Sequence, residues 1–173
     1  MRAKHEIQHA KSKDMNVTIR KATEGDFQEI FNLNMEFSIF QRTPEKFTVT
    51  LQQMVEEQNY FQCMVAAVED QKIVGFATTF FAFYSWSGKS LYLEDLYVKD
   101  EFRKLGIGRK LMDAVIAYAK ETGCRKLRWQ VSKWNSYAIE MYKKMGAKIE
   151  ETEINCLLPL GQPQKSELFQ KAL

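Results

Sequence analysis

Cysteine and histidine are scarce in this chain, and this scarcity excludes several kinds of site. The 173 residues include three cysteines and two histidines. The cysteines, Cys63, Cys124 and Cys156, are odd in number and lack metal-ligand spacing, so the sequence favours neither a disulfide framework nor a zinc site. Such sparse cysteine usage fits a reducing compartment. We therefore expect a cytoplasmic protein without a bound metal.

Long apolar runs and a strong excess of one charge are also missing. No apolar stretch reaches the roughly 18 residues of a membrane-spanning helix, and the first residues lack the apolar centre of a signal peptide. A net charge of +3 is too small to indicate nucleic acid or a membrane by itself. The basic cluster Arg125, Lys126 and Arg128 runs into a predicted strand without a clear stacking platform, so we interpret it as a solvated face.

What is present is the composition of an ordinary globule, with 45% hydrophobic and 27% charged residues. Residues 1–14 are polar and basic and contain both histidines, so we expect a disordered tail there. A metal bound by His5 and His9 is the less favoured alternative. From residue 15 to 173 no linker or repeat interrupts the pattern, which predicts one domain.

The hydrophobic periodicity predicts an α/β fold with one mixed, mostly antiparallel sheet and helices on both faces. Thr23, with a carboxylate three residues later, is typical of a helix start, and Gly123 and Gly146 are typical of helix ends. We expect strands at 17–22, 61–68, 73–84, 91–98, 126–131, 148–157 and 167–172, and helices at 23–37, 43–55, 107–119 and 135–145.

A basic, glycine-bearing turn joins the strand that ends at Val98 to the helix that begins at Ile107. It reads Arg103-Lys104-Leu105-Gly106-Ile107-Gly108 and is followed by Arg109. Glycine allows positive φ and a close approach of the backbone to a ligand, and the free N–H groups of a first helical turn bind anions. The turn therefore predicts a site for a diphosphate.

Two common phosphate-binding motifs do not fit this chain. A dinucleotide fingerprint needs a third glycine three residues after Gly108, where Leu111 stands instead. A Walker A loop would end at Gly88-Lys89-Ser90, but Phe83 occupies the position of its first glycine.

The remaining pattern, Arg-x-x-Gly-x-Gly between a strand and a helix, resembles the GCN5-related N-acetyltransferases (GNAT family). Trp134-Asn135 and the segment from Tyr142 to Ala147 match the same family further along the chain. Within it, the sequence is most similar to the diamine (spermidine/spermine) and thialysine acetyltransferases. The resemblance covers nearly all of residues 15–173 and implies the GNAT fold, acetyl-CoA as the donor and a primary amine as the acceptor.

The resemblance also implies which residues hold coenzyme A. The glycine turn would bind the diphosphate, and the backbone of residues 96–98 would bind the pantetheine arm as an extra strand. The full set is Leu96, Tyr97, Val98, Arg103, Lys104, Leu105, Gly106, Ile107, Gly108, Arg109, Asn135 and Tyr142. Asn135 is also expected to cap the helix that it opens.

Acetyl transfer needs a proton acceptor for the amine, whose pKa lies near 10.4, and a proton donor for the departing thiolate. Glu94 is the candidate acceptor, although a strand carboxylate paired with a neighbouring base is the alternative. Asp95 would face the opposite side of a regular strand unless a bulge intervenes. The resemblance makes Tyr142 the general acid. Because no cysteine has a histidine neighbour in sequence, we expect direct transfer in a ternary complex.

The acceptor is less well specified. Tyr84, Trp86 and Trp134 are candidates for an aromatic wall, with Glu94 and Asp95 as its carboxylates, and core or dimer contacts are the equal alternative for the three aromatic residues. The polyamine enzymes carry an acidic residue where Tyr84 stands and an aromatic-acid pair where Phe40-Gln41 falls, which weakens a polyamine assignment. A thialysine-like amino acid, another small amine and a protein lysine or N-terminus all stay open.

A non-catalytic module that senses acyl-CoA is the alternative from another functional class. The retained Glu94 and Tyr142 favour the enzyme. We also expect a homodimer, because relatives with this segment pattern commonly pair and the late strands would otherwise leave exposed edges. We expect neither nucleic acid nor a membrane as a partner.

Overall fold

The computed structural model describes residues 16–152 and 155–158. The chain divides at Ser132 into two units, and each is described by itself. The tail expected at residues 1–14 and the strand expected at 167–172 lie outside the described residues.

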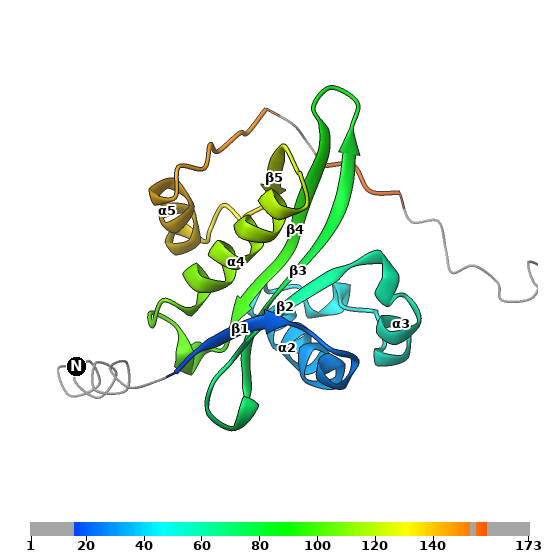
Figure 1. The fold of residues 1–173 in the computed structure, drawn as a ribbon, viewed down its shortest axis with the longest axis vertical. Coiled ribbons are helices and arrows are strands. Elements are labelled where there is room, and N and C mark those ends of the chain that lie inside the picture. The colour runs from blue at the N-terminus through cyan, green and yellow to red at the C-terminus, as the bar shows by residue number, and fades with distance from the viewer. Residues whose placement is uncertain (1–15, 153–154, 159–173) are drawn as a thin grey trace, which may run out of the picture. The chain divides into compact units, whose positions relative to one another are not determined.

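A five-stranded mixed sheet forms the frame of the first unit (Figure 1). Its strands lie in sequence order, so each strand pairs with the next one along the chain. The first three pairings are antiparallel and the last is parallel, which confirms the predicted mixed, mostly antiparallel sheet. The strands are β1 (Thr18–Lys21), β2 (Gln62–Ala67), β3 (Ile73–Tyr84), β4 (Gly88–Val98) and β5 (Lys126–Trp129).

Among the described residues of this unit, three α-helices accompany the sheet: α2 (Phe27–Phe40), α3 (Leu51–Glu56) and α4 (Ile107–Glu121). The single helix expected over residues 43–55 is wrong, because this segment forms a short 3-10 turn at Pro44–Lys46 and then α3. Phe47 between them is extended, and the Thr50 hydroxyl accepts a hydrogen bond from the Gln53 N–H at 3.2 Å, which starts a new helix.

Helices α2 and α4 lie on opposite faces of the sheet, as two adjacent residues of β1 show. Successive side chains of a strand point to opposite faces. Arg20 binds Asp26 just before α2, whereas the ammonium of Lys21 lies 4.9 Å from the ring centroid of Tyr118 in α4. The predicted coverage of both faces is therefore confirmed.

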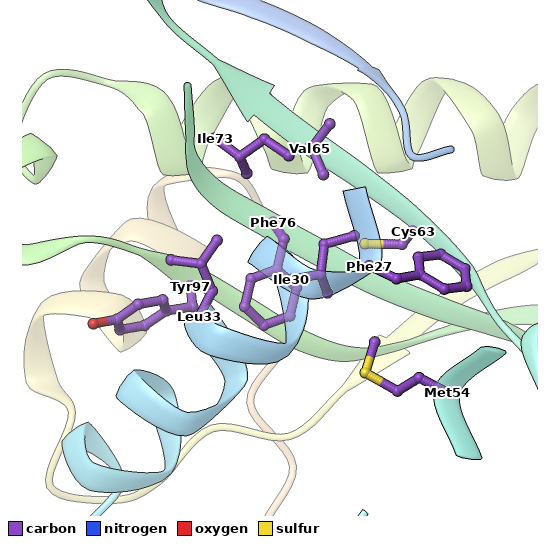
Figure 2. Close-up of a cluster of buried hydrophobic side chains, with 9 residues drawn as sticks. All are labelled: Phe27, Ile30, Leu33, Met54, Cys63, Val65, Ile73, Phe76 and Tyr97. Carbon is purple, nitrogen blue, oxygen red and sulfur yellow. The ribbon is translucent and has the colours of Figure 1, made fainter. Parts of the chain in front are cut away.

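The face under α2 holds a compact hydrophobic core (Figure 2). Phe27, Ile30 and Leu33 repeat every three residues along α2 and are buried against the sheet. Fully burying one such side chain contributes about 1.5–3 kcal/mol. The cluster comprises Phe27, Ile30, Leu33, Met54, Cys63, Val65, Ile73, Phe76 and Tyr97.

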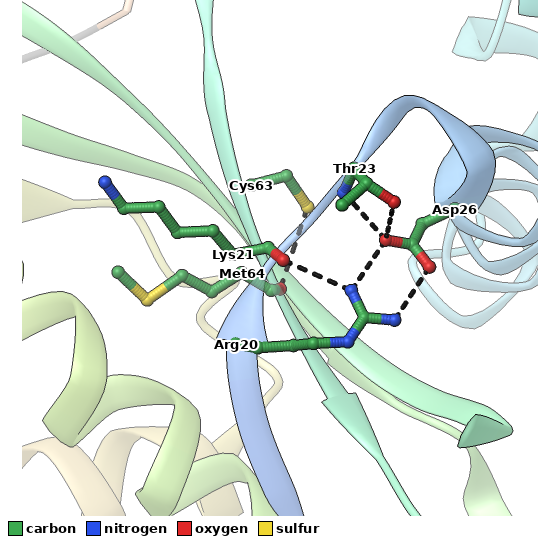
Figure 3. Close-up of polar contacts among 6 residues, drawn as sticks. All are labelled: Arg20, Lys21, Thr23, Asp26, Cys63 and Met64. Atoms are coloured by element: carbon green, nitrogen blue, oxygen red, sulfur yellow. Dashed lines mark hydrogen bonds and ion pairs between the residues drawn. The ribbon is translucent and has the colours of Figure 1, made fainter. Parts of the chain in front are cut away.

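A partly buried polar cluster around Asp26 fixes the entry into α2 (Figure 3). The Arg20 guanidinium donates to both carboxylate oxygens of Asp26, at 2.7 and 2.9 Å. The Thr23 N–H and hydroxyl donate to Asp26 Oδ2 at 2.7 and 2.9 Å, which confirms the helix start predicted at Thr23. The paired guanidinium is the largest cause of a pKa of Asp26 far below its usual range.

On the other face, α4 starts where β4 has ended, after a 3-10 turn at Asp100–Phe102. Ile107, Leu111, Val115 and Ala119 recur every four residues and are all buried. This apolar stripe holds the first turn of α4 close to the end of β4. An ideal Cβ placed on Gly108 would lie 3.9 Å from Val98 Cγ2.

The second unit contains α5 (Ser136–Lys144). Asn135 caps it as predicted, because its side-chain oxygen accepts a hydrogen bond from the Ala138 N–H at 3.2 Å. The strand expected at 148–157 is wrong for the described residues 148–152 and 155–157, none of which is in a strand. This stretch is rich in charge, and Glu151 forms an exposed ion pair with Lys133 at 2.9 Å instead.

Candidate active site

Strands β4 and β5 run together for only part of their length, and the site is built around the point where they separate. Their parallel pairing runs from Ser90↔Lys126 to Leu93↔Trp129, whereas β4 continues to Val98. In the described part of the chain, no strand pairs with this edge of β4 beyond Leu93. We call the opening along residues 94–98 the fork.

The register shows which backbone groups face the fork. The Lys99 N–H donates to the Val74 carbonyl at 2.9 Å, so the backbone of Lys99 points towards β3. Because these directions alternate along a strand, Tyr97 also points towards β3, whereas Leu96 and Val98 point into the fork. An extended ligand would therefore bind Leu96 and Val98, and the backbone of Tyr97 would not contribute.

A β-bulge lies at the start of the fork. Thr78 pairs with Asp95, but Thr79 pairs with Leu93, so Glu94 is an extra residue in β4. The regular alternation that would separate Glu94 and Asp95 onto opposite faces is interrupted here. The two candidate carboxylates therefore belong to one irregularity of the strand.

Glu94 and Asp95 differ in their surroundings. Glu94 is exposed, whereas Asp95 is partly buried opposite Thr78, whose other partner is the buried Cys63. Burial, and then the charge of Glu94, raise the pKa of Asp95 to about 7. Burial also raises the pKa of the Cys63 thiol to about 12, so this cysteine is a poor nucleophile.

The glycine turn has the backbone geometry of an anion-binding loop. Lys104 and Gly106 both adopt positive φ, at 64° and 78°, and Gly106 is the N-cap of α4 without a side-chain cap. Free N–H groups of the first turn of α4 follow at Ile107, Gly108 and Arg109. A Cβ on Gly106 would meet nothing within 4 Å, so the cradle is open.

The basic side chains around the turn differ in what they contact. Arg109 binds Asp113 within α4 at 2.8 Å, and Lys104 is exposed. Arg103 is directed elsewhere: its Nε donates to the Val98 carbonyl at 2.9 Å, and its guanidinium lies 4.3 Å from the ring centroid of Phe40.

The aromatic candidates in the hairpin of β3 and β4 are divided. Tyr84 is half-buried with the guanidinium of Arg128 4.7 Å from its ring centroid, whereas Trp86 at the turn is fully exposed. Sequence reasoning missed Phe80 and Tyr92, whose stacked rings lie 5.0 Å apart on the same two strands. Their cross-strand register was the missing information.

In the second unit, Tyr142 is buried on α5, and Trp134 is exposed just before the Asn135 cap. Burial raises the pKa of Tyr142 to about 12. The hydroxyl therefore stays protonated at neutral pH and can act as a proton donor.

Comparison with known proteins identifies this arrangement. The sequence profile of the Acetyltransferase (GNAT) family matches residues 27–147, a segment that contains α2, the fork, the glycine turn and Tyr142. The chain belongs to the GNAT family. It is an N-acetyltransferase, as the relatives below also indicate. GNAT enzymes generally use acetyl-CoA as the acetyl donor.

Individual relatives agree with this assignment. The chain is 32% identical over 143 residues to thialysine N-epsilon-acetyltransferase of Bos taurus, a match that covers 76% of this chain and 84% of the bovine protein. It is 33% identical over 139 residues to human spermidine/spermine N(1)-acetyltransferase-like protein 1, covering 75% of this chain but 20% of that protein.

Among solved structures, an aminoglycoside acetyltransferase from an uncultured soil metagenomic sample, in complex with trehalose, superposes with a TM-score of 0.69 at 26% identity. The match covers 84% of this chain and 97% of that one. This superposition supports the GNAT fold.

The described residues contain no group of three or more histidine, cysteine, aspartate or glutamate side chains arranged to hold a metal ion. None of their helices combines the length and the apolar character needed to cross a bilayer. His5 and His9 lie outside these residues.

Proposed function

We propose that this GNAT enzyme transfers the acetyl group of acetyl-CoA directly to a primary amine of a small molecule, in a ternary complex. The observation that carries the proposal is the fork of β4, which opens beside the glycine turn. The fork offers the backbone of Leu96 and the N–H of Val98, with which no described strand pairs, to an extended amide-bearing arm, and the turn offers N–H groups to a diphosphate. Coenzyme A is a ligand with both parts in this order.

In this proposal the backbone of Leu96 and Val98 holds the pantetheine arm, and the N–H groups from Leu105 to Arg109 hold the diphosphate. Lys104 and Arg109 supply positive charge at the same place. Asn135 contributes to binding the arm in addition to capping α5. Acetyl-CoA supplies the thioester, and every other requirement falls on the protein.

Proton transfer is assigned to three residues. The carboxylates of Glu94 and Asp95 accept the proton of the ammonium, directly or through water, and make the amine nucleophilic. A pKa of about 7 suits Asp95 for this step at neutral pH, so the proposed acceptor is the pair and not Glu94 alone. Tyr142 gives its proton to the sulfur as the carbon–sulfur bond breaks.

We propose a thialysine-like amino acid or another small amine as the acceptor. The bovine relative named for thialysine aligns along most of its own length, and Tyr84 replaces a carboxylate that a polyamine would need. Tyr84, Trp86 and Trp134 are the proposed aromatic contacts. A cytoplasmic location and a homodimer complete the proposal, and light scattering that gave the 20.3 kDa mass of one chain would contradict the dimer.

The experiment is a screen of small primary amines and lysine peptides, in which thiol release from acetyl-CoA is followed. Acetylation of a small amine with intersecting double-reciprocal plots is the expected result. Parallel lines, or acetyl label left on the protein, would replace direct transfer by a ping-pong route. Tight binding of acetyl-CoA without turnover of any amine would favour a sensing module.

A further inference from the structure

Arg103 is the first residue of the glycine turn, yet its side chain is directed away from the turn. The guanidinium lies over two rings, at 4.3 Å from the centroid of Phe40 and 5.2 Å from that of Tyr97. Its Nε donates to the Val98 carbonyl at 2.9 Å, and its Nη1 donates to Asp100 at 3.0 Å. One side chain thus joins the turn, the fork edge of β4 and the last residue of α2.

The end of α2 reaches both sides of the fork. Phe40 contacts Arg103, which follows β4, while the Gln41 side-chain oxygen accepts a hydrogen bond from the Ser132 hydroxyl at 3.1 Å, shortly after β5. Two consecutive residues therefore connect α2 to the chain beyond each of the two separating strands. The last turn of α2 therefore bridges the two sides of the fork.

Other residues of α2 contact the end of β4 and Lys99, which follows it. The ammonium of Lys99 lies 3.0 Å from a Glu29 oxygen and 3.6 Å from a Glu36 oxygen. The Tyr97 hydroxyl donates to Glu36 at 3.4 Å, and its ring packs 5.3 Å from that of Phe37. Tyr97 therefore fixes the end of β4 against α2.

Tyr97 also connects this packing to the carboxylates. Asp95 and Tyr97 are two residues apart, after the bulge, so their side chains share one face of β4. Tyr97, which packs against α2, therefore belongs to the same strand face as the candidate proton acceptor Asp95. The Val98 carbonyl, which faces the fork, is already occupied by Arg103, so only the Val98 N–H is left for a ligand.

We propose that Arg103 is a positioning residue. It holds the fork edge of β4 against the last turn of α2 and so sets the positions of both the acetyl-CoA site and the amine site. This inference rests on the proposed function of the fork. The positioning role differs from the neutralisation of phosphate expected from the sequence. Stacking and directed hydrogen bonds need the planar geometry of the guanidinium as well as its charge.

The test compares two donors in the full-length protein: acetyl-CoA and S-acetylpantetheine, which lacks the diphosphate. Arg103→Met should raise the KM of both donors by a similar factor, roughly tenfold for a lost stacked and hydrogen-bonded guanidinium. It should also raise the KM of the best amine at saturating acetyl-CoA. Lys104→Met is the contrast, and should weaken acetyl-CoA while leaving S-acetylpantetheine unchanged.

Arg103→Lys separates charge from geometry, since lysine keeps the charge but lacks the planar array of N–H donors of a guanidinium. We expect it to behave like Arg103→Met. Phe40→Leu should raise the amine KM in the same way, and its effect should not add to that of Arg103→Met. Circular dichroism and a thermal midpoint establish that each variant is folded.

Restored acetyl-CoA affinity in Arg103→Lys, or a loss confined to acetyl-CoA in Arg103→Met, would overturn the positioning role and assign Arg103 to the phosphates. In that case the proposed function would stand. Failure of the wild-type protein to bind either donor would instead remove the proposed function, and this inference with it.

Discussion

Asp95 lies next to Glu94 at the bulge of β4, and the charge of Glu94 adds to burial in raising the pKa of Asp95 to about 7. An ordinary aspartate, with a pKa near 3.9, is fully ionised at neutral pH. Asp95 instead titrates in the range where an amine acetyltransferase works, and this has consequences for both stability and rate.

The contribution of Asp95 to the free energy of unfolding should fall as pH rises from about 4 to 7. The folded state holds this proton more tightly than the unfolded state, so the cost of ionisation begins near the unfolded pKa and is complete above the folded one. Asp95→Asn removes the cost and should stabilise the protein at pH 8 by about 2–4 kcal/mol. The two proteins should converge near pH 4. Urea denaturation of both across pH 4–9 measures the difference, and a constant difference would contradict the raised pKa.

The pH profile of the reaction should report the same group. If the ionised pair accepts the amine proton, kcat/KM should rise through about pH 7 at saturating acetyl-CoA. Glu94→Gln removes the neighbouring charge and should move this rise to lower pH, whereas Asp95→Asn should abolish it. A rise that stays in place in Asp95→Asn would assign it to another group.

Gly108→Ala should separate binding of the coenzyme from folding. Gly108 is helical, and an added Cβ would meet only Val98 at an ordinary 3.9 Å. Alanine should therefore stabilise the helix by about 0.5–1 kcal/mol, while its methyl group obstructs a diphosphate at the N-terminus of α4. Calorimetry should show at least tenfold weaker binding of coenzyme A. Gly25→Ala is the matched control and should bind coenzyme A normally. Its added Cβ would lie 3.8 Å from Thr23 Oγ1.

Tyr142→Phe keeps the ring and removes the hydroxyl whose pKa burial raises to about 12. Loss of one proton-transfer group typically lowers a rate by about 10²–10⁴-fold. We expect that loss in kcat, with coenzyme affinity within about twofold of wild type, because the substitution removes an interaction made only in the transition state. Stopped-flow measurement of thiol release and calorimetry provide the two values. Turnover at the wild-type rate would remove Tyr142 from the mechanism.

Asp26→Asn should destabilise the fold without a direct effect on the reaction. The carboxylate accepts hydrogen bonds from Arg20 and Thr23, and its pKa is strongly lowered by the paired guanidinium. Stability from such a group is present above the unfolded pKa and is lost as pH falls below about 4. We expect a cost of about 2 kcal/mol at pH 7 that shrinks towards pH 2. Thermal unfolding at several pH values measures it, and a cost independent of pH would point to packing instead.

Local chemistry explains why parts of this fold were predictable. The bounds of β3, Ile73–Tyr84, match the expected strand, because a charged turn precedes it and Ser85 to Gly88 follow it. The Thr23 start of the first helical segment and the Asn135 cap of α5 also follow from side chains that act within three residues of themselves. The family resemblance came from the same kind of short-range spacing around the glycine turn.

What the sequence could not provide depends on contacts between distant segments. The bulge at Glu94 exists only in relation to Thr78 and Thr79 on β3, so its place was open until the register was known. Arg103 looked like a phosphate ligand in sequence, but Phe40 lies 63 positions before it and takes its guanidinium. The expected strand at 148–157 had a suitable pattern, yet no described residue in it pairs with the sheet.

The fork also gives the coenzyme a place in the thermodynamics of the protein. Strand β4 lies between β3 and β5, yet its edge at Leu96 and Val98 has no neighbouring strand among the described residues. Bound as we propose, the pantetheine arm completes that edge, and acetyl-CoA at a hundred times its Kd would add about 2.7 kcal/mol to the free energy of unfolding. The cell's supply of acetyl-CoA would then govern how long each molecule of the enzyme survives local opening and proteolysis, as well as how fast it works.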